Sequence, residues 1–160
     1  MRSHLIFIEL LLLLLPVCGM QAAQAGTTAA DSTVCREYSL LMKVRGHEIT
    51  GICAMNIEPG GHIVGTVVNE FGVKAFDFVF ADGKAAVMNV IGPLNKWYIR
   101  SVLRKDLTFI LTNMEKKAVD AVKGKRRLTI AENGTVSMHN DRFGISYTFT
   151  SMSADHETDQ

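Results

Sequence analysis

The chain has 160 residues, 17 basic and 16 acidic side chains, and a formal net charge of +1. This length is typical of one domain, and the balanced charge disfavours a dedicated nucleic-acid-binding protein, which needs a basic surface to neutralise phosphates. An apolar share of 48% disfavours intrinsic disorder. Beyond the first 25 residues, no apolar run approaches the length of about 18 residues that a membrane-spanning helix needs.

The first 25 residues are typical of an export signal. Seventeen of them are apolar, including six consecutive leucines from Leu10 to Leu15. Arg2 provides the positive charge of such a signal, and Ala23-Gln24-Ala25 forms a cleavage site of the small-x-small type. We therefore predict that residues 1–25 are a signal peptide and that the rest of the chain is exported to the cell envelope.

A second interpretation of the same segment depends on Cys18. This cysteine follows the apolar core and has a leucine three positions before it, as in bacterial lipoprotein signals. Val17 occupies a position where a small residue is usual, and Pro16 is also atypical. In this interpretation residues 1–17 are the signal and Cys18 carries the lipid; an uncleaved anchor is a third alternative.

After the leader, the sequence predicts a short tether followed by one β-rich domain. Residues 26–34 are small and polar and are predicted to be a tether, a single β-rich domain is predicted over 35–152, and the tail 153–160 is predicted to be flexible. Short β-rich runs between turn residues predict strands. They cover about 36–45, 48–57, 62–69, 73–81 and 84–91. Their short connections predict antiparallel neighbours.

The hydrophobic period changes after Gly92-Pro93. From Leu94 to Asn113 apolar residues recur at the spacing of one helix face, which predicts a long helix. One more helical turn is expected over 115–122, and three further strands over about 126–131, 135–140 and 143–150. The predicted fold class is α+β: a curved antiparallel sheet of about eight strands, a half-open barrel, with one long helix packed on or in it.

Several of these strands are apolar on both faces. In the strand 73–81, Phe76, Phe78 and Phe80 point to one face, whereas the opposite face carries Val73, Ala75, Asp77 and Val79. A sheet with one wet face alternates apolar and polar residues, so both faces need a cover. One helix covers a width of only about 10 Å. The remaining apolar surface is predicted to fill a curled interior, to contact a partner chain or to bind a hydrophobic ligand.

The candidate ligand-binding residues lie on one face of the third and fourth strands. They are predicted to line an apolar groove, with ordinary core packing as the alternative. The set comprises Phe76, Phe78, Phe80, Ile63 and Val67. Phe71, in a turn between Glu70 and Gly72, is a candidate tip for membrane contact, or else a packed turn residue.

Residues able to support catalysis or bind a metal do not form a recognisable pattern. The sequence contains no Gly-x-Ser-x-Gly motif, and its histidines lack the paired spacing of metal ligands. We therefore expect no enzymatic activity, no cofactor and no metal. Asp77, a charge among apolar neighbours, is either a perturbed acid or a structural residue, namely a solvent-side carboxylate or the salt-bridge partner of a basic residue. The basic run Lys116 to Arg127 is either a solvated loop or a contact for anionic lipid headgroups.

Cys35 and Cys53 follow the leader and are expected to meet an oxidising compartment. They form either one disulfide or two separate side chains. A hairpin turning at Gly46-His47 would place Cys53 opposite about Leu40, so a bridge needs another register.

The segment from Thr66 to Phe78, with its Asn-Glu-Phe-Gly-Val-Lys turn and Phe-Asp-Phe strand, resembles an uncharacterised group of Gram-negative envelope lipoproteins. Pro93-Leu94-Asn95-Lys96 and Leu103-Arg104-Lys105-Asp106-Leu107 extend the resemblance, which spans about residues 36–112. The order of strands and helix is also similar to the LolA/LolB lipoprotein-sorting carriers. In these carriers a half-open barrel holds acyl chains on a concave apolar face.

The resemblance implies a non-enzymatic envelope protein that binds acyl chains or lipoproteins and works in the periplasm or on the periplasmic face of the outer membrane. Its expected partners are acyl chains and a membrane surface, without nucleic acid. The alternative is a structural or interaction module whose apolar sheet face binds an envelope protein.

Overall fold

A computed structural model of the chain describes residues 33–44 and 47–152. The predicted signal peptide, Cys18, most of the predicted tether and the tail 153–160 lie outside the described residues. Within them, no helix is long and apolar enough to cross a membrane. The elements are β1 Val34–Val44, β2 His47–Ile57, β3 Ile63–Asn69, β4 Lys74–Ala81, β5 Lys84–Met88, η1 Gly92–Leu94, α2 Trp97–Glu115, β6 Asp120–Lys123, β7 Arg126–Ile130, β8 Val136–Asn140 and β9 Ile145–Ser151.

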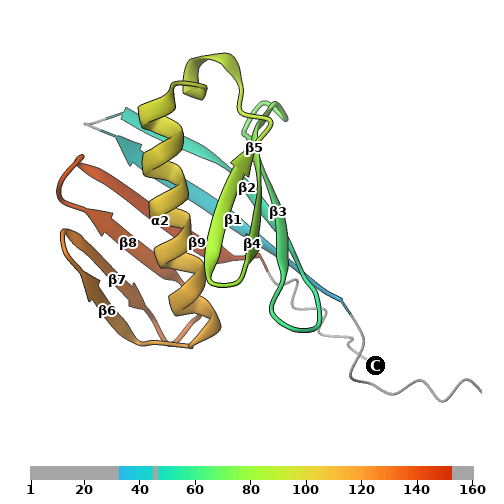
Figure 1. Ribbon diagram of the computed structural model, residues 1–160, viewed down its shortest axis with the longest axis vertical. Coiled ribbons are helices and arrows are strands. Elements are labelled where there is room, and N and C mark those ends of the chain that lie inside the picture. The colour runs from blue at the N-terminus through green and yellow to red at the C-terminus, as the bar shows by residue number, and fades with distance from the viewer. Residues whose placement is uncertain (1–32, 45–46, 153–160) are drawn as a thin grey trace, which may run out of the picture.

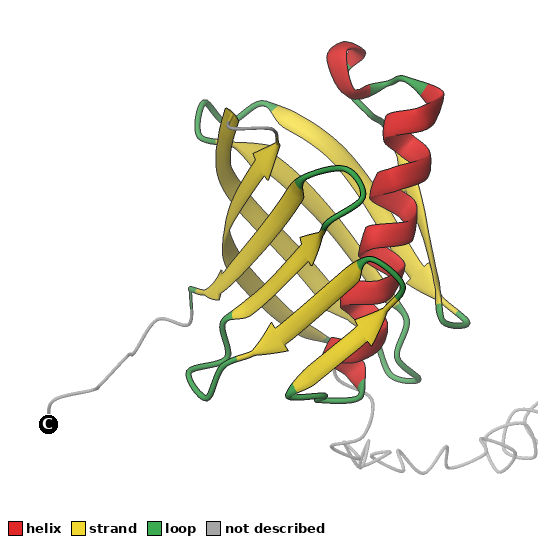
Figure 2. Ribbon diagram, turned by 90° about the vertical axis from the view of Figure 1, so that its left-hand side faces the viewer, coloured by secondary structure: helices red, strands yellow, loops and turns green. Residues whose placement is uncertain are grey.

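The strands form one antiparallel sheet in the order β5-β4-β3-β2-β1-β9-β8-β7-β6. The sheet curves around one side of α2, and its two edge strands, β5 and β6, do not pair with each other (Figures 1 and 2). The predicted α+β class, with a curved antiparallel sheet and one long helix in the described chain, is confirmed.

The inner face of the sheet packs against α2 and forms the hydrophobic core. Phe78 is 0% exposed, and its ring lies over Gly65 on the neighbouring strand β3. A Cβ at Gly65 would lie 2.2 Å from this ring, so only glycine leaves room for it. Aromatic packing over a strand glycine therefore fixes this part of the core.

The helix also covers one edge of the sheet. The backbone N–H of Ala85 in β5 donates a hydrogen bond to Oγ1 of Thr108 (2.9 Å), and Arg100 donates through Nη2 to the carbonyl of Val87 (3.2 Å). These side chains satisfy edge-strand backbone groups that would otherwise be free to pair with another chain. The helix is thus attached to the β5 side by hydrogen bonds as well as by apolar packing.

The prediction of a helical turn over 115–122 is wrong, because residues Asp120–Lys123 form a strand, β6, in addition to the eight strands that were predicted. Lys123 pairs with Arg126 across a two-residue turn, and Gly124 in that turn has a φ of +63°. Glycine adopts this left-handed conformation without the steric cost that a side chain brings. The basic stretch is therefore a β-hairpin over much of its length.

The prediction that Ala75 faces away from the phenylalanines is also wrong. The β3–β4 register shifts between Val67 and Val68, which pair with Phe76 and Lys74 respectively, leaving Ala75 as an extra residue. This bulge turns Ala75 into the core next to Phe76, and both residues are buried.

Cys35 and Cys53 do not form a disulfide with each other. Val44 pairs with His47, so Cys53 lies opposite Tyr38 and not Leu40, while Cys35 lies opposite Asn56. Cys53 is buried on the inner face, and Cys35 is exposed on the other face of the sheet. Burial raises the pKa of the Cys53 thiol to about 12, which keeps it protonated.

Asp77 lies on the outer face of β4 and links three consecutive strands of the sheet. Its Oδ1 accepts a hydrogen bond from Thr66 in β3 (2.7 Å), and its Oδ2 accepts from Asn89, just after β5 (2.7 Å), and from Lys74 (3.1 Å). The hydrogen bonds from Asn89 and Thr66 lower the pKa of Asp77, and Lys74 adds a smaller effect. Asp77 is therefore a salt-bridge partner, as one of the two interpretations predicted.

Replacing Asp77 by Asn should lower the free energy of unfolding at pH 7, and the loss should shrink in acid. The folded pKa lies below the unfolded value near 3.8, so the stabilisation is present above the unfolded pKa and is lost as the pH falls through the folded one. Urea unfolding of both proteins at pH 7 and pH 3 tests this. Asp82→Asn, in the exposed β4–β5 turn, is the control for charge. An Asp77→Asn loss that is the same at both pH values would contradict the prediction.

Candidate ligand-binding site

An apolar cavity of about 800 Å³ opens between the first half of α2 and the ends of β1, β2 and β9. This volume lies within the range of small-molecule binding sites, about 300–1,000 Å³. Most of its lining is aliphatic or aromatic. The apolar lining residues are Met42, Val44, Ile49, Leu94, Trp97, Tyr98, Ile99, Val102, Leu103, Phe143, Ile145 and Tyr147. His47, Ser101, Lys105, Arg126 and Arg142 supply the polar part.

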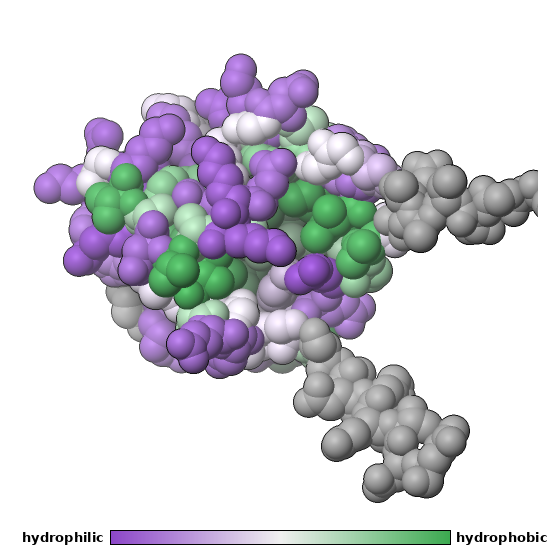
Figure 3. Space-filling view, turned by 90° about the horizontal axis from the view of Figure 1, so that it is seen from below, coloured by the Kyte–Doolittle hydropathy of each residue, from purple (hydrophilic) through white to green (hydrophobic). Residues whose placement is uncertain are grey.

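Two strongly exposed aromatic side chains lie at the end of the molecule at which this cavity opens. Trp97 at the start of α2 is 83% exposed, and Phe71 in the β3–β4 turn is 81% exposed. Both lie at the same end of the sheet, because the segment leading to α2 returns beside β4 through a hydrogen bond from Ile91 N to Ala75 O (2.9 Å). At the opposite end, separate apolar patches lie between hydrophilic side chains (Figure 3). Phe71 is thus an exposed tip and not a packed turn residue.

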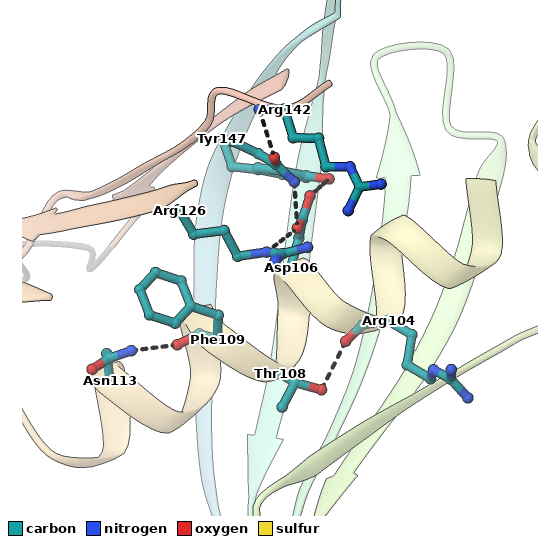
Figure 4. Close-up of polar contacts among 9 residues, drawn as sticks. Arg104, Asp106, Thr108, Phe109, Asn113, Arg126, Arg142 and Tyr147 are labelled. Carbon is teal, nitrogen blue, oxygen red and sulfur yellow. Dashed lines mark hydrogen bonds and ion pairs between the residues drawn. The ribbon is translucent and has the colours of Figure 1, made fainter. Parts of the chain in front are cut away.

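Next to the cavity, a buried carboxylate joins α2 to three strands. Asp106 is 0% exposed; its Oδ1 accepts hydrogen bonds from Nε of Arg126 in β7 (2.6 Å) and from Nδ2 of Asn140 in β8 (2.8 Å). Its Oδ2 accepts from the hydroxyl of Tyr147 in β9 (3.1 Å). Figure 4 shows the side chains of Arg126 and Tyr147 meeting at Asp106. We call these four residues the Asp106 network.

Burial disfavours the charged form of the Asp106 carboxylate, whereas its hydrogen-bond partners favour that form. Desolvation raises the pKa of Asp106, while hydrogen bonds and the charge of Arg126, and the hydrogen bonds from Tyr147 and Asn140, act in the other direction. Burial and the neighbouring Asp106 also raise the pKa of Tyr147 well above its usual value, so its hydroxyl remains a donor. Both carboxylate oxygens are occupied, which makes Asp106 an anchor for the helix.

The five residues that were predicted from the sequence to bind a ligand all lie on the inner face of the sheet. Each of them is buried, and none is among the residues that line the cavity. The structure brings them together as Phe76, Phe78, Phe80, Ile63 and Val67 on β3 and β4, within one core cluster. The cavity lies on the same inner side of the sheet, but at β1, β2 and β9.

Sequence reasoning missed the Asp106 network, although one signal for it was present. Asp106 follows Ile99 by seven residues and precedes Ile110 by four, so it occupies the apolar face of the predicted helix. A charge at such a position needs buried partners. The identity of those partners depends on strand positions after residue 125, which helix periodicity does not specify.

The other titratable groups are paired on the surface or lie apart from one another. His62 contacts Glu58 (2.7 Å), and His139 contacts Asp141 (3.0 Å), while His47 lines the cavity and His156 lies outside the described residues. Over residues 33–44 and 47–152, no group of three or more histidine, cysteine or acidic residues could hold a metal ion.

Comparison of the chain with protein-family models and with curated proteins finds no match. The cavity and the Asp106 network therefore carry the functional argument.

Replacing Asp106 by Asn should lower the free energy of unfolding by about 3 kcal/mol, because it leaves the partly buried Arg126 without its counter-charge. Urea denaturation measures this loss. The matched control is Asp141→Asn, which removes the acidic partner of Arg127. This ion pair is more exposed than the one between Asp106 and Arg126, so the control should cost less than about 1 kcal/mol.

A double variant separates loss of the charge pair from loss of packing. Asp106→Leu combined with Arg126→Met replaces the ion pair by apolar side chains and should recover only the part of the loss that comes from the unpaired guanidinium, because Asn140 and Tyr147 still lack their acceptor. If Asp106→Asn costs no more than Asp141→Asn, the carboxylate is not the anchor of the helix.

Proposed function

We propose that this protein is a non-enzymatic cell-envelope protein that binds an acyl chain in the cavity beside α2. The observation that carries the proposal is the apolar volume of about 800 Å³ on the inner side of a curved, unclosed sheet. The cavity offers twelve apolar side chains and few polar ones, which suits a ligand that needs little hydrogen bonding.

The hydrophobic effect is sufficient to drive such binding. Removal of each methylene group from water contributes about 0.8 kcal/mol, so ten buried methylenes contribute about 8 kcal/mol before the cost of association. The helix keeps one wall of the cavity in place through the Asp106 network, so the apolar space does not have to form when the ligand arrives.

The proposed setting is the periplasm or the periplasmic face of the outer membrane. The export signal, with Cys18 as a lipid attachment site or as part of a removed leader, supports this setting. So does the fold-level resemblance to the LolA/LolB carriers, from which we infer lipid or lipoprotein transport as the process. Phe71 and Trp97, both exposed at the cavity end, are suited to contact with a membrane surface.

The proposal predicts that the protein carries lipid when it is purified from cells without added fatty acid. Mass spectrometry of an organic extract should find acyl chains at up to one per protein. Val102→Trp should reduce this amount at least tenfold, because the indole fills part of the cavity. The matched control Val119→Trp adds the same side chain at an exposed position outside the cavity and should retain the lipid. No lipid in the wild-type extract, or equal lipid in both variants, would contradict acyl binding.

An interaction module is the second candidate, and the outer face of the sheet favours it. Ile52, Val64 and Val73 are exposed apolar residues on or beside β2, β3 and β4. In this alternative, cross-linking in cells returns one stoichiometric envelope protein, and Val64→Arg abolishes that product. Acyl binding predicts the lipid result above, with no effect of Val64→Arg on the lipid content.

A further inference from the structure

The polar residues of the cavity are strongly biased in charge. Lys105, Arg126 and Arg142 are cationic, and no aspartate or glutamate is among the lining residues. The nearest buried carboxylate, Asp106, has hydrogen bonds to both oxygens and does not line the cavity. The lining therefore presents cations to a ligand, and the only one of them paired with an acidic side chain within the described residues is Arg126, which binds Asp106.

A second groove, of about 820 Å³, meets the cavity at two of these residues. It runs along α2 between β5 and β6, and Lys105 and Arg126 line both spaces. The charged residues of this groove are all basic: Lys84, Arg104, Lys105, Lys116, Lys123 and Arg126. An amphiphile whose chain occupies the cavity would place its polar end at a junction of uniform positive charge.

Two of the three cations that line the cavity have no acidic partner. Neither Lys105 nor Arg142 makes an ion pair within the described ranges, and the guanidinium of Arg142 lies 5.4 Å from the ring centroid of Phe143. In Figure 4 the Arg142 side chain extends from the β8–β9 turn alongside Tyr147, which also lines the cavity. Arg126 donates a hydrogen bond from its Nε to Asp106. Two side chains with unused donors thus lie beside an apolar space.

We propose that the ligand is an acidic amphiphile, whose carboxylate or phosphate headgroup binds Lys105 and Arg142 while its chain lies in the cavity. This inference rests on the proposed function and adds the chemistry of the headgroup. Charge-assisted hydrogen bonds to carboxylate or phosphate are stronger than neutral ones, and the guanidinium offers a bidentate arrangement. The basic groove beyond the junction has room for a head larger than a carboxylate.

The test compares three ligands that share one chain: dodecanoate, dodecyl phosphate and 1-dodecanol, each titrated calorimetrically into delipidated full-length protein. The double variant Lys105→Gln and Arg142→Gln should weaken binding of the two acids about tenfold and leave dodecanol binding unchanged. Added salt should weaken the acids only. The control double variant Arg36→Gln and Lys125→Gln removes the same charge from exposed positions outside both spaces and should change none of the three affinities.

The outcomes separate this inference from the function on which it depends. If none of the three ligands binds, acyl binding itself fails. If all three bind and the Lys105 and Arg142 variant weakens them equally or not at all, the acyl site stands and the headgroup assignment is overturned. Tighter binding of dodecanoate than of dodecyl phosphate would indicate a carboxylate ligand, and tighter binding of dodecyl phosphate would indicate a phosphate ligand.

Discussion

The buried carboxylate of Asp106 is the interaction on which the arrangement of helix and sheet depends. On the β5 side, α2 is held by apolar packing and by hydrogen bonds from side chains to the strand edge. On the other side, one carboxylate binds donors from β7, β8 and β9. The helix therefore bridges the two halves of a sheet whose edge strands do not meet. Because an unpaired buried charge is costly, the anchor allows few alternative positions.

The inner side of the sheet has two regions with different roles. Under β3 and β4 the large side chains, Phe78 above all, fill the space and contact each other. Beside β1, β2 and β9 the helix does not complete the packing, and the apolar cavity remains. A fixed helix next to unfilled apolar surface is the physical basis of the proposed acyl site, and the unpaired cations at its edge are the basis of the proposed headgroup preference.

Much of the fold follows from local sequence patterns, whereas the cavity does not. Alternation and turn residues predicted eight of the strands to within a few residues, and helical spacing predicted α2. The errors have local causes: a glycine turn at Gly124 created β6, and a bulge turned Ala75 inward. The face with Phe76, Phe78 and Phe80 was recognisable as apolar, but apolar pattern alone does not distinguish a filled interior from an open one. That distinction depends on how far the helix stands from each strand, and the Asp106 network, built from residues far apart in sequence, sets that position.

The most direct test is to observe which methyl groups contact a bound chain. Intermolecular nuclear Overhauser effects between palmitate methylenes and the labelled methyls of delipidated protein would provide this. The account predicts contacts with Ile99, Val102 and Ile145, which line the cavity, and none with Ile63 or Val67, which lie in the filled core. Contacts confined to Ile63 and Val67, or no contacts at saturating palmitate, would contradict it.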